Sequence, residues 1–499
     1  DNNTAIGYNS LLNNTTGASN TAVGSDALDS NTTGEQNTAV GHNCGHRITT
    51  GSFNALLGKS AGQGITTNGY CVALGFETLT DTSLSGNNHV ALGFRSMYKN
   101  TSGASNSGLG FRTLHENTTG SFLTAIGNDS LFNNTTGDNN SGGGYYSLRE
   151  NTTGDNNTGF GRNALAVNTT GSQNTAVGSL ALDANTTTSN NTAVGYAALS
   201  ANTTGRNTAF GSQALKDVQT TDHNTAIGDH CLWKTTTGSN NTGLGFQALV
   251  FNTTGSQNVA VGADSLDSNT TGSFNIAVGH DALQANTTGG YNVAIGQTAL
   301  GAATTVSHNT AVGGGALERA TTANNTAIGF GCLGQNTSGG INTGLGSYSL
   351  FLNTTGDNNT AVGHNSLGNN TTADNNTAVG TSAMLANTTS NYSIAIGTEA
   401  MGSLDGAGNS TAIGYLSMYA HSGDNNVAVG NYSLRTGSNA YNVAVGVSAM
   451  TKVSGGAGGV AVGYQSGYHP TGNYNTWLGY AAGFGTAAAG AYSNVGIGQ

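Results

Sequence analysis

The chain has 499 residues, of which 79 are glycine, 1 is proline and only 7% are charged, with a formal net charge of −11. Because basic residues are few and form no patch, a phosphate backbone would find no counter-charge, and we expect no nucleic-acid binding. No run of about 20 apolar residues occurs, so we expect no membrane span. Apolar residues make up 36% of the chain and recur at regular positions, which argues against disorder.

One short unit repeats along the whole sequence. The stretch 20–36 reads NTAVGSDALDSNTTGEQ, and NTAVG begins again at Asn37. The glycine that closes NTAVG, here called the register glycine, recurs 30 times between Gly7 and Gly498. Nearly every step is 17 residues, a few are 16 or 18, and the last is 19. A fixed short period indicates one supersecondary unit per copy, stacked on its neighbours.

The unit predicts an all-β fold. V-G and A-L read as two short strands and N-T-T-G as a tight turn, so each copy forms one rung of a parallel β-solenoid, or β-roll. With rungs about 4.8 Å apart, some 30 rungs would make an elongated rod on the order of 140 Å long. We expect one solenoid domain over residues 1–499, with irregular rungs at about 42–86 and 403–499, where the N-T-T-G corner is lost.

Side chains alternate across a strand, so Thr21 and Val23 share one side and Ala22 and Gly24 the other. The place of Val23 is almost always apolar, as is that of Leu28 in the following A-L pair. We therefore predict that the Val and Leu columns face the interior and hold the stack together. The Ala and Gly side would then face outward, either as a thin surface or as one that another copy approaches closely.

The N-T-T-G corner places an asparagine at the same position of many rungs. We expect these asparagines to stack into an amide ladder. The same triplet also fits the N-x-[ST] glycan acceptor, so a glycosylated corner is the alternative, with O-linked sugars on the threonines as a variant of it. The corner residues are Asn14, Asn31, Asn117, Asn134, Asn151, Asn168, Asn202, Asn252, Asn269, Asn286 and Asn353.

An aromatic residue often follows the register glycine. Such a row would either shield the next rung or, if exposed, stack on sugar rings or on a partner protein. The residues of this row are Tyr8, Phe76, Phe94, Phe111, Tyr196, Phe246, Tyr415 and Tyr464.

Groups with the spacing of a catalytic or metal site are not apparent. Cys44, Cys231 and Cys332 take the small-residue place before the leucine, and with Cys71 they are interpreted as small buried hydrophobes. The histidines have no fixed partner in the repeat, and no phosphate-loop lysine follows any glycine. We expect no catalytic residues, no metal and no cofactor, and therefore no enzyme.

The unit N-T-A-V-G-x-x-A-L-x-x-N-T-T-G resembles repeats of bacteriophage tail-fibre-like proteins. N-V-A-I-G, as at Asn292–Gly296, is also similar to the β-roll heads of trimeric autotransporter adhesins. The resemblance covers essentially the whole chain. It implies a parallel β-roll, an extracellular location on a cell surface or virion, and self-association.

Two functions follow as hypotheses. The first is a structural extracellular fibre or filament, assembled head to tail because both ends of the sequence stop inside the repeat, with glycosylation of the corner as a further expectation. The alternative is a receptor-binding or glycan-binding adhesin, or a phage tail-fibre shaft, built as a homotrimer.

Overall fold

The computed structural model describes residues 2–81, 84–403, 405–485 and 493–498, and it confirms the all-β parallel solenoid. The chain forms two compact units, Asp1–Thr254 and Gly255–Gln499. No helix occurs among the described residues. Within the predicted irregular range 403–499, residues 404, 486–492 and 499 lie outside the described part.

Each rung contributes one strand of three residues that ends just before the register glycine. The first unit holds β1 (Thr4–Ile6), β2 (Thr21–Val23), β3 (Thr38–Val40), β4 (Ala55–Leu57), β5 (Val72–Leu74), β6 (Val90–Leu92), β7 (Ser107–Leu109), β8 (Thr124–Ile126), β9 (Ser141–Gly143), β10 (Thr158–Phe160), β11 (Thr175–Val177), β12 (Thr192–Val194), β13 (Thr208–Phe210), β14 (Thr225–Ile227) and β15 (Thr242–Leu244).

The second unit continues the same pattern. It holds β16 (Val259–Val261), β17 (Ile276–Val278), β18 (Val293–Ile295), β19 (Thr310–Val312), β20 (Thr326–Ile328), β21 (Thr343–Leu345), β22 (Thr360–Val362), β23 (Thr377–Val379), β24 (Ile394–Ile396), β25 (Thr411–Ile413), β27 (Val427–Val429), β29 (Val443–Val445), β30 (Val460–Val462), β31 (Thr476–Leu478) and β32 (Val495–Ile497). Two shorter strands, β26 (Ala420–His421) and β28 (Thr436–Gly437), pair with each other.

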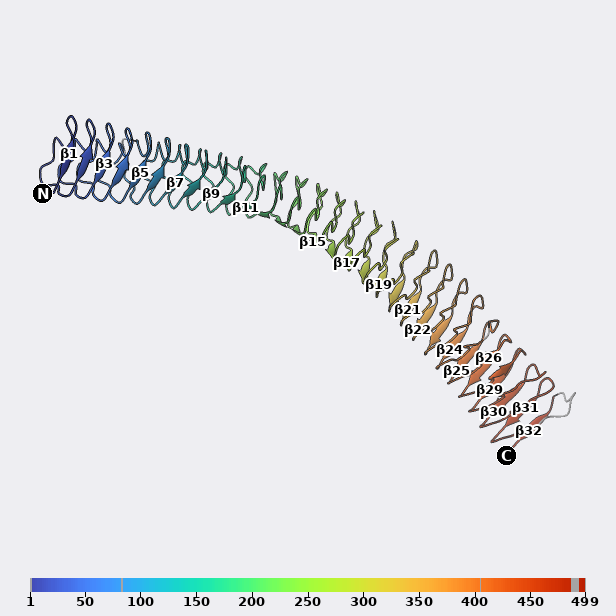
Figure 1. The fold of residues 1–499 in the computed structure, drawn as a ribbon. Coiled ribbons are helices and arrows are strands. Elements are labelled where there is room, and N and C mark those ends of the chain that lie inside the picture. The colour runs from blue at the N-terminus through green and yellow to red at the C-terminus, as the bar shows by residue number, and fades with distance from the viewer. Residues whose placement is uncertain (1, 82–83, 404, 486–492, 499) are drawn as a thin grey trace. The chain divides into compact units, whose positions relative to one another are not determined.

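Successive strands within each unit pair in parallel, and equivalent residues lie side by side, so that Thr158 is opposite Thr175 and Gly159 opposite Ala176. Figure 1 shows the strands of each unit following one another in chain order along one side of the stack. Because equivalent places meet, each place of the repeat forms a column or row of similar residues, and a row can be read directly from the sequence.

The register glycine is required by the backbone. At Gly24, φ is +134°, and a Cβ placed there would lie 2.4 Å from the carbonyl oxygen of Gly41 in the next rung. An L-residue would therefore be strained at this position and would also clash with the neighbouring rung.

The predicted orientation of the strand is wrong. The central alanine of each strand faces the interior, and Ala22, Ala176 and Ala226 are fully buried. The flanking Thr and Val places face outward, and Val177 and Ile227 keep 39% and 41% of their surface exposed. The alanine side is thus the inner side, and the Val column forms the outer face of the sheet.

The reason for this inversion is the narrow interior. A Cβ at Gly243, the central residue of β15, would lie 2.4 Å from Sγ of Cys231 and 3.4 Å from Cδ1 of Leu232 in the preceding rung. The inner side of the strand therefore rests directly on the A-L segment, and little more than a methyl group fits between them. Valine in that place would overpack the core.

The A-L segment is a turn and not the second strand that the sequence suggested. Its leucine has a left-handed backbone, with φ of 52° at Leu165 and Leu182. Both leucines are nevertheless fully buried. The Leu column is therefore internal as predicted, and each rung buries one large aliphatic side chain where we had expected two.

Two rungs show how the core conserves volume. Leu56 and Trp477 occupy the central strand place that elsewhere carries alanine or glycine, and both are buried. Glycines replace the core leucine beside them: a Cβ at Gly62 would lie 2.8 Å from Leu56, and one at Gly467 would lie 2.8 Å from Trp477. A large residue in the strand column is thus offset by the loss of one in the Leu column.

The stretch 42–86 differs in its corner. Ile48 and Ile65 take the place of the corner asparagine, and both are fully buried. The polar ladder is therefore replaced locally by apolar packing.

All four cysteines are free and buried, as predicted, and burial raises the pKa of Cys44, Cys231 and Cys332 to about 12.

We expect Leu199→Ala to lower the stability of its rungs by about 2–5 kcal/mol, because Leu199 is fully buried. The matched change Val177→Ala on the outer face should cost less than about 1 kcal/mol, since that side chain is already 39% exposed. Hydrogen exchange of the rungs on either side of each substitution measures the effect, because solenoids open locally. Equal losses would contradict the inverted strand orientation.

Stability should fall in acid because of His89. This buried histidine accepts a hydrogen bond from the backbone N–H of Asn106, and burial lowers the pKa of His89 to about 4. The unfolded chain takes up a proton near pH 6.5, whereas the folded one does not until about pH 4. Stability present above pH 6.5 is thus lost as the pH falls toward 4, by on the order of 3 kcal/mol.

His89→Asn should remove this loss in the rungs around residue 89. Hydrogen exchange at pH 7.5 and pH 4.5 measures it. His421 in the second unit is also buried and its pKa is also lowered by burial, so exchange there should keep its acid dependence and serves as the internal control. An unchanged acid loss around residue 89 would exclude His89 as its source.

Candidate functional site

The corner asparagines lie inside the solenoid, except for Asn14, which is half-buried. Asn151 is fully buried, and its Nδ2 donates to Oδ1 of Asn134 at 2.9 Å and to the carbonyl oxygen of Gly154 at 2.9 Å. Its own Oδ1 accepts from Nδ2 of Asn168 at 2.8 Å. The same amide-to-amide bond joins Asn31 to Asn14, Asn117 to Asn100, Asn134 to Asn117, Asn185 to Asn168, Asn286 to Asn269, Asn353 to Asn336 and Asn370 to Asn353.

This geometry gives the asparagines a structural role. At most of these corners an N-linked glycan would have to attach to an Nδ2 atom that is buried and donates two hydrogen bonds, as in Asn151. The corner threonines differ from each other: Thr152 donates its hydroxyl to the carbonyl oxygen of Thr169, whereas Thr153 is exposed. The exposed surface of the corner is therefore formed by the second threonine of N-T-T-G.

A second buried asparagine row was missed. It is formed by the asparagine that opens N-T-A-V-G. Oδ1 of Asn140 accepts from the backbone N–H of Asn157 at 2.8 Å, and Nδ2 of Asn157 donates to the carbonyl oxygen of Gly171 at 2.8 Å. Both asparagines are fully buried. The signal was present in the sequence, because this asparagine begins nearly every copy of the unit.

The predicted aromatic row is largely exposed. Tyr8, Phe94, Phe111, Tyr196, Phe246, Tyr415 and Tyr464 are exposed, and Phe76 is half-buried. The rings of neighbouring rungs stack where they are consecutive, with centroids 5.4 Å apart for Phe76 and Phe94 and 5.1 Å for Phe94 and Phe111.

A second row of exposed aromatics went unnoticed in the sequence. It occupies the place just before the residue that opens N-T-A-V-G, which is usually asparagine. The row consists of Phe53, Tyr70, Phe122, Phe274, Tyr291, Tyr392, Tyr441 and Tyr474. Its members have positive φ, such as 59° at Tyr70.

Most charged side chains lie on one surface, formed by the first, second, fifth and sixth residues after the register glycine. We call it the variable corner, because these four places differ from rung to rung. Opposite charges meet there between adjacent rungs. Arg95 contacts Glu77 at 2.7 Å, and Arg112 contacts Asp129 at 2.8 Å. Two shallow hollows also open on this surface.

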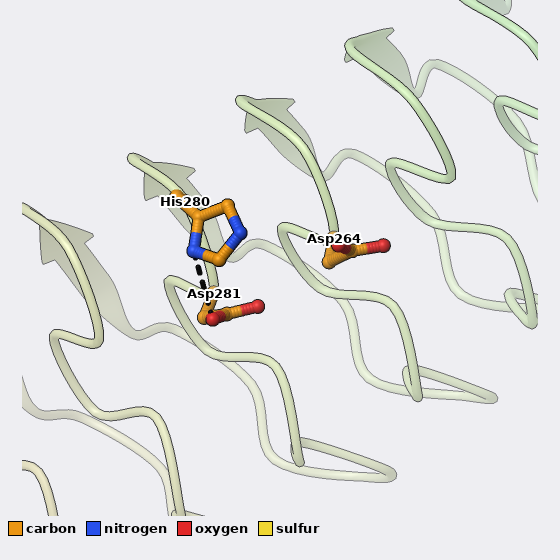
Figure 2. Close-up of side chains that lie close together, drawn as sticks. All are labelled: Asp264, His280 and Asp281. Atoms are coloured by element: carbon orange, nitrogen blue, oxygen red, sulfur yellow. Dashed lines mark ion pairs between the residues drawn. The ribbon is translucent and has the colours of Figure 1, made fainter.

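Like charges meet at one position of the variable corner (Figure 2). One ligand atom from each of Asp264, His280 and Asp281 lies within 4.8 Å of the others. His280 Nδ1 is 2.8 Å from Asp281 Oδ2. Burial raises the pKa of the neighbouring Asp267 carboxyl, and the charges of Asp264 and Asp281 raise it further.

Carboxylate and imidazole groups are donors for divalent cations. The sequence hid this grouping because Asp264 is 17 residues from Asp281. All three side chains are partly or fully exposed, so they would leave most of a coordination shell to water.

A comparison with models of protein families gave no match, and a search of curated proteins gave none either. Among the described residues, no helix has the length and apolar character needed to cross a bilayer.

We expect Asn151→Ala to destabilise its rungs by about 1–3 kcal/mol, because it removes one hydrogen bond from the buried amide of Asn134 and one from that of Asn168. The control Thr153→Ala, on the exposed side of the same corner, should change stability by less than about 0.5 kcal/mol. Hydrogen exchange over residues 130–175 compares the two. Equal effects would contradict a structural role for the amide ladder.

Proposed function

We propose that this chain is a structural, fibre-forming protein without enzymatic activity, whose solenoid units associate with other copies of the same chain. The observation that carries the proposal is the outer face of the sheet. Among the described residues, none of the strands contains Asp, Glu, Lys or Arg. The outward places are threonine, serine or aliphatic, apart from Phe160, Phe210 and Gly143, and many of the aliphatic ones are about 40% exposed.

This composition is unusual for a solvent-facing sheet. The solvent-facing side of a sheet normally carries polar residues, and exposed strands are commonly protected by charged side chains. Depletion of charged residues with retained apolar surface is instead typical of the centre of an interface. The outer face therefore has the character of a surface that is covered in the assembled protein.

The size and spacing of the face favour a second copy as its partner. Fifteen strands of three residues, about 4.8 Å apart, cover roughly 70 by 10 Å, or about 700 Å². This is close to the area that one partner contributes to a standard interface. Only a partner with the same rung spacing can meet every row in register, and another copy of the chain has that spacing by construction.

Placement outside the cell, on a cell surface or on a virion, is part of the proposal and is supported by the resemblance to tail-fibre and adhesin repeats. Glycosylation is retained only in its O-linked form. It is supported by the exposed second threonines of the corner, such as Thr33, Thr136 and Thr170.

The exposed aromatic rows favour a second candidate, a glycan-binding adhesin or tail-fibre shaft. Flat rings along a corner offer stacking surfaces for sugars. A glycan array probed with the intact protein tests it. Binding that is lost when Phe94 and Phe111 are changed to serine would support this candidate.

The interface is tested with Val177→Glu combined with Ile227→Glu, which places two charges on the outer face of the first unit. We expect wild-type protein to sediment as an assembly and this variant to dissociate, because the charges would be buried unpaired. The control, Thr153→Glu combined with Thr170→Glu, adds the same charge on exposed corner threonines and should assemble normally.

Sedimentation velocity combined with negative-stain microscopy measures the outcome. A wild-type monomer at high concentration would contradict the proposal. Filaments formed by both variants would instead indicate head-to-tail association through strand edges, since the face charges do not touch those edges. Three copies per particle, lost in the face variant only, would indicate the homotrimer.

A further inference from the structure

The second unit contains a hollow of about 420 Å³ on the variable corner, spanning the rungs of β18 to β21. This volume falls within the range of small-molecule sites. The lining residues come from the first, second, fifth and sixth places after four successive register glycines. They combine aromatic rings, side-chain amides and one carboxylate on a floor of glycines.

The hollow exists because glycine replaces side chains that other rungs carry. At the second place after the register glycine, glycine occurs only as Gly315 and Gly331. Elsewhere this place holds residues such as Asn365 and Tyr348, with the same left-handed backbone. The absence of side chains here is therefore not demanded by the turn, because the fold accepts asparagine and tyrosine with φ near +55°.

Aromatic rings occupy the space that the glycines leave. A Cβ at Gly331 would lie 3.1 Å from the ring of Tyr348, and one at Gly334 would lie 3.2 Å from the ring of Phe351. The ring of Tyr348 is nearly perpendicular to both neighbouring rings, with interplanar angles of 82° to Phe330 and 89° to Phe351. Centroid separations are 5.5 and 5.3 Å. The rings thus present surfaces in more than one direction.

A carboxylate without a cation lies at the same hollow. Glu318 makes no ion pair within the described part of the chain, and its Oε2 lies 4.0 Å from where a Cβ of Gly315 would be. Other carboxylates of the variable corner, such as Glu77 and Asp129, are paired with an arginine of the adjacent rung. Arg319 follows Glu318 in the chain but is exposed and does not pair with it.

We propose that this hollow, lined by Phe330, Tyr348, Phe351 and Glu318, binds a quaternary ammonium group such as the trimethylammonium of choline. Aromatic faces attract a cation through the ring quadrupole, and rings in perpendicular orientations can contact a roughly spherical cation from several sides. A quaternary ammonium has no N–H donors, so it loses no hydrogen bonds to water on entering. Glu318 supplies the opposite charge at the rim.

This binding activity goes beyond the structural role and does not depend on it. The same head group occurs in free choline, in phosphocholine and in choline lipids. Titration calorimetry with choline, with phosphocholine and with phosphatidylcholine vesicles distinguishes these sources. Phosphocholine should bind less tightly than choline if Glu318 lies close to the bound cation, because its phosphate is repelled.

The decisive comparison is between choline and its neutral isostere 3,3-dimethylbutan-1-ol. We expect choline to bind at least about fivefold more tightly, because only the cation gains from the rings and the carboxylate. Gly315→Asn should abolish binding by filling the hollow, with a backbone that Asn365 shows to be compatible. Glu318→Gln and Tyr348→Leu should each weaken binding about threefold or more.

Glu399→Gln is the matched control, since it removes a carboxylate at the second place of a distant rung and should leave binding unchanged. Circular dichroism of every variant confirms that the solenoid is retained. The proposal is overturned if choline does not bind, if the neutral isostere binds equally well, or if Gly315→Asn binds as wild type. It is also overturned if saccharides bind this hollow and choline does not displace them.

Discussion

Hydrogen bonding between identical places of successive rungs is the constraint on which the rest of this structure depends. Each strand of three residues is too short to be stable alone, and each rung encloses asparagine amides that would be costly to bury without partners. Stacking satisfies both needs together. The amide of Asn151 joins Asn134 and Asn168, and Asn140 holds the backbone of Asn157. A shift of one rung relative to the next would break the backbone and side-chain bonds together.

This constraint divides the repeat into places that vary little and places that vary freely. Four places vary little: the register glycine, the core leucine and the two asparagines. Each usually stacks on the same residue type in both neighbouring rungs, so a substitution in one rung also affects the packing of the two rungs beside it. The first, second, fifth and sixth places after the register glycine mostly face solvent and are free to differ. Most of the ion pairs, the cluster of Asp264, His280 and Asp281 and the hollow floored by Gly315 and Gly331 lie there. Specific chemistry is therefore concentrated at this corner, whereas the uncharged sheet face repeats along each unit.

The side-chain volume of the interior is kept constant by the strand column and the Leu column together, and not by either column alone. Leu56 and Trp477 are accommodated because glycine stands in the adjacent core place. The hollow on the variable corner follows the same relation on the outside, since Tyr348 and Phe351 lie where Gly331 and Gly334 have no side chain. Glycine in this chain thus serves two purposes: it allows close stacking at the register position, and elsewhere it makes room for a large neighbour.

The sequence alone determined the rung length, the parallel stacking, the burial of the Leu column and the positions of the cysteines, because a period of 17 residues leaves each place facing its own copy. It did not determine which side of the strand is internal. Alternation along Thr21, Ala22 and Val23 is equally compatible with either choice, and hydrophobicity favoured the wrong one. The tertiary structure decided it through the left-handed turn at the A-L pair, which directs the leucine inward and leaves space for little more than a methyl group beneath the strand. Likewise, residues 17 apart in the sequence, such as Asp264 and Asp281, become spatial neighbours only when the rungs are stacked.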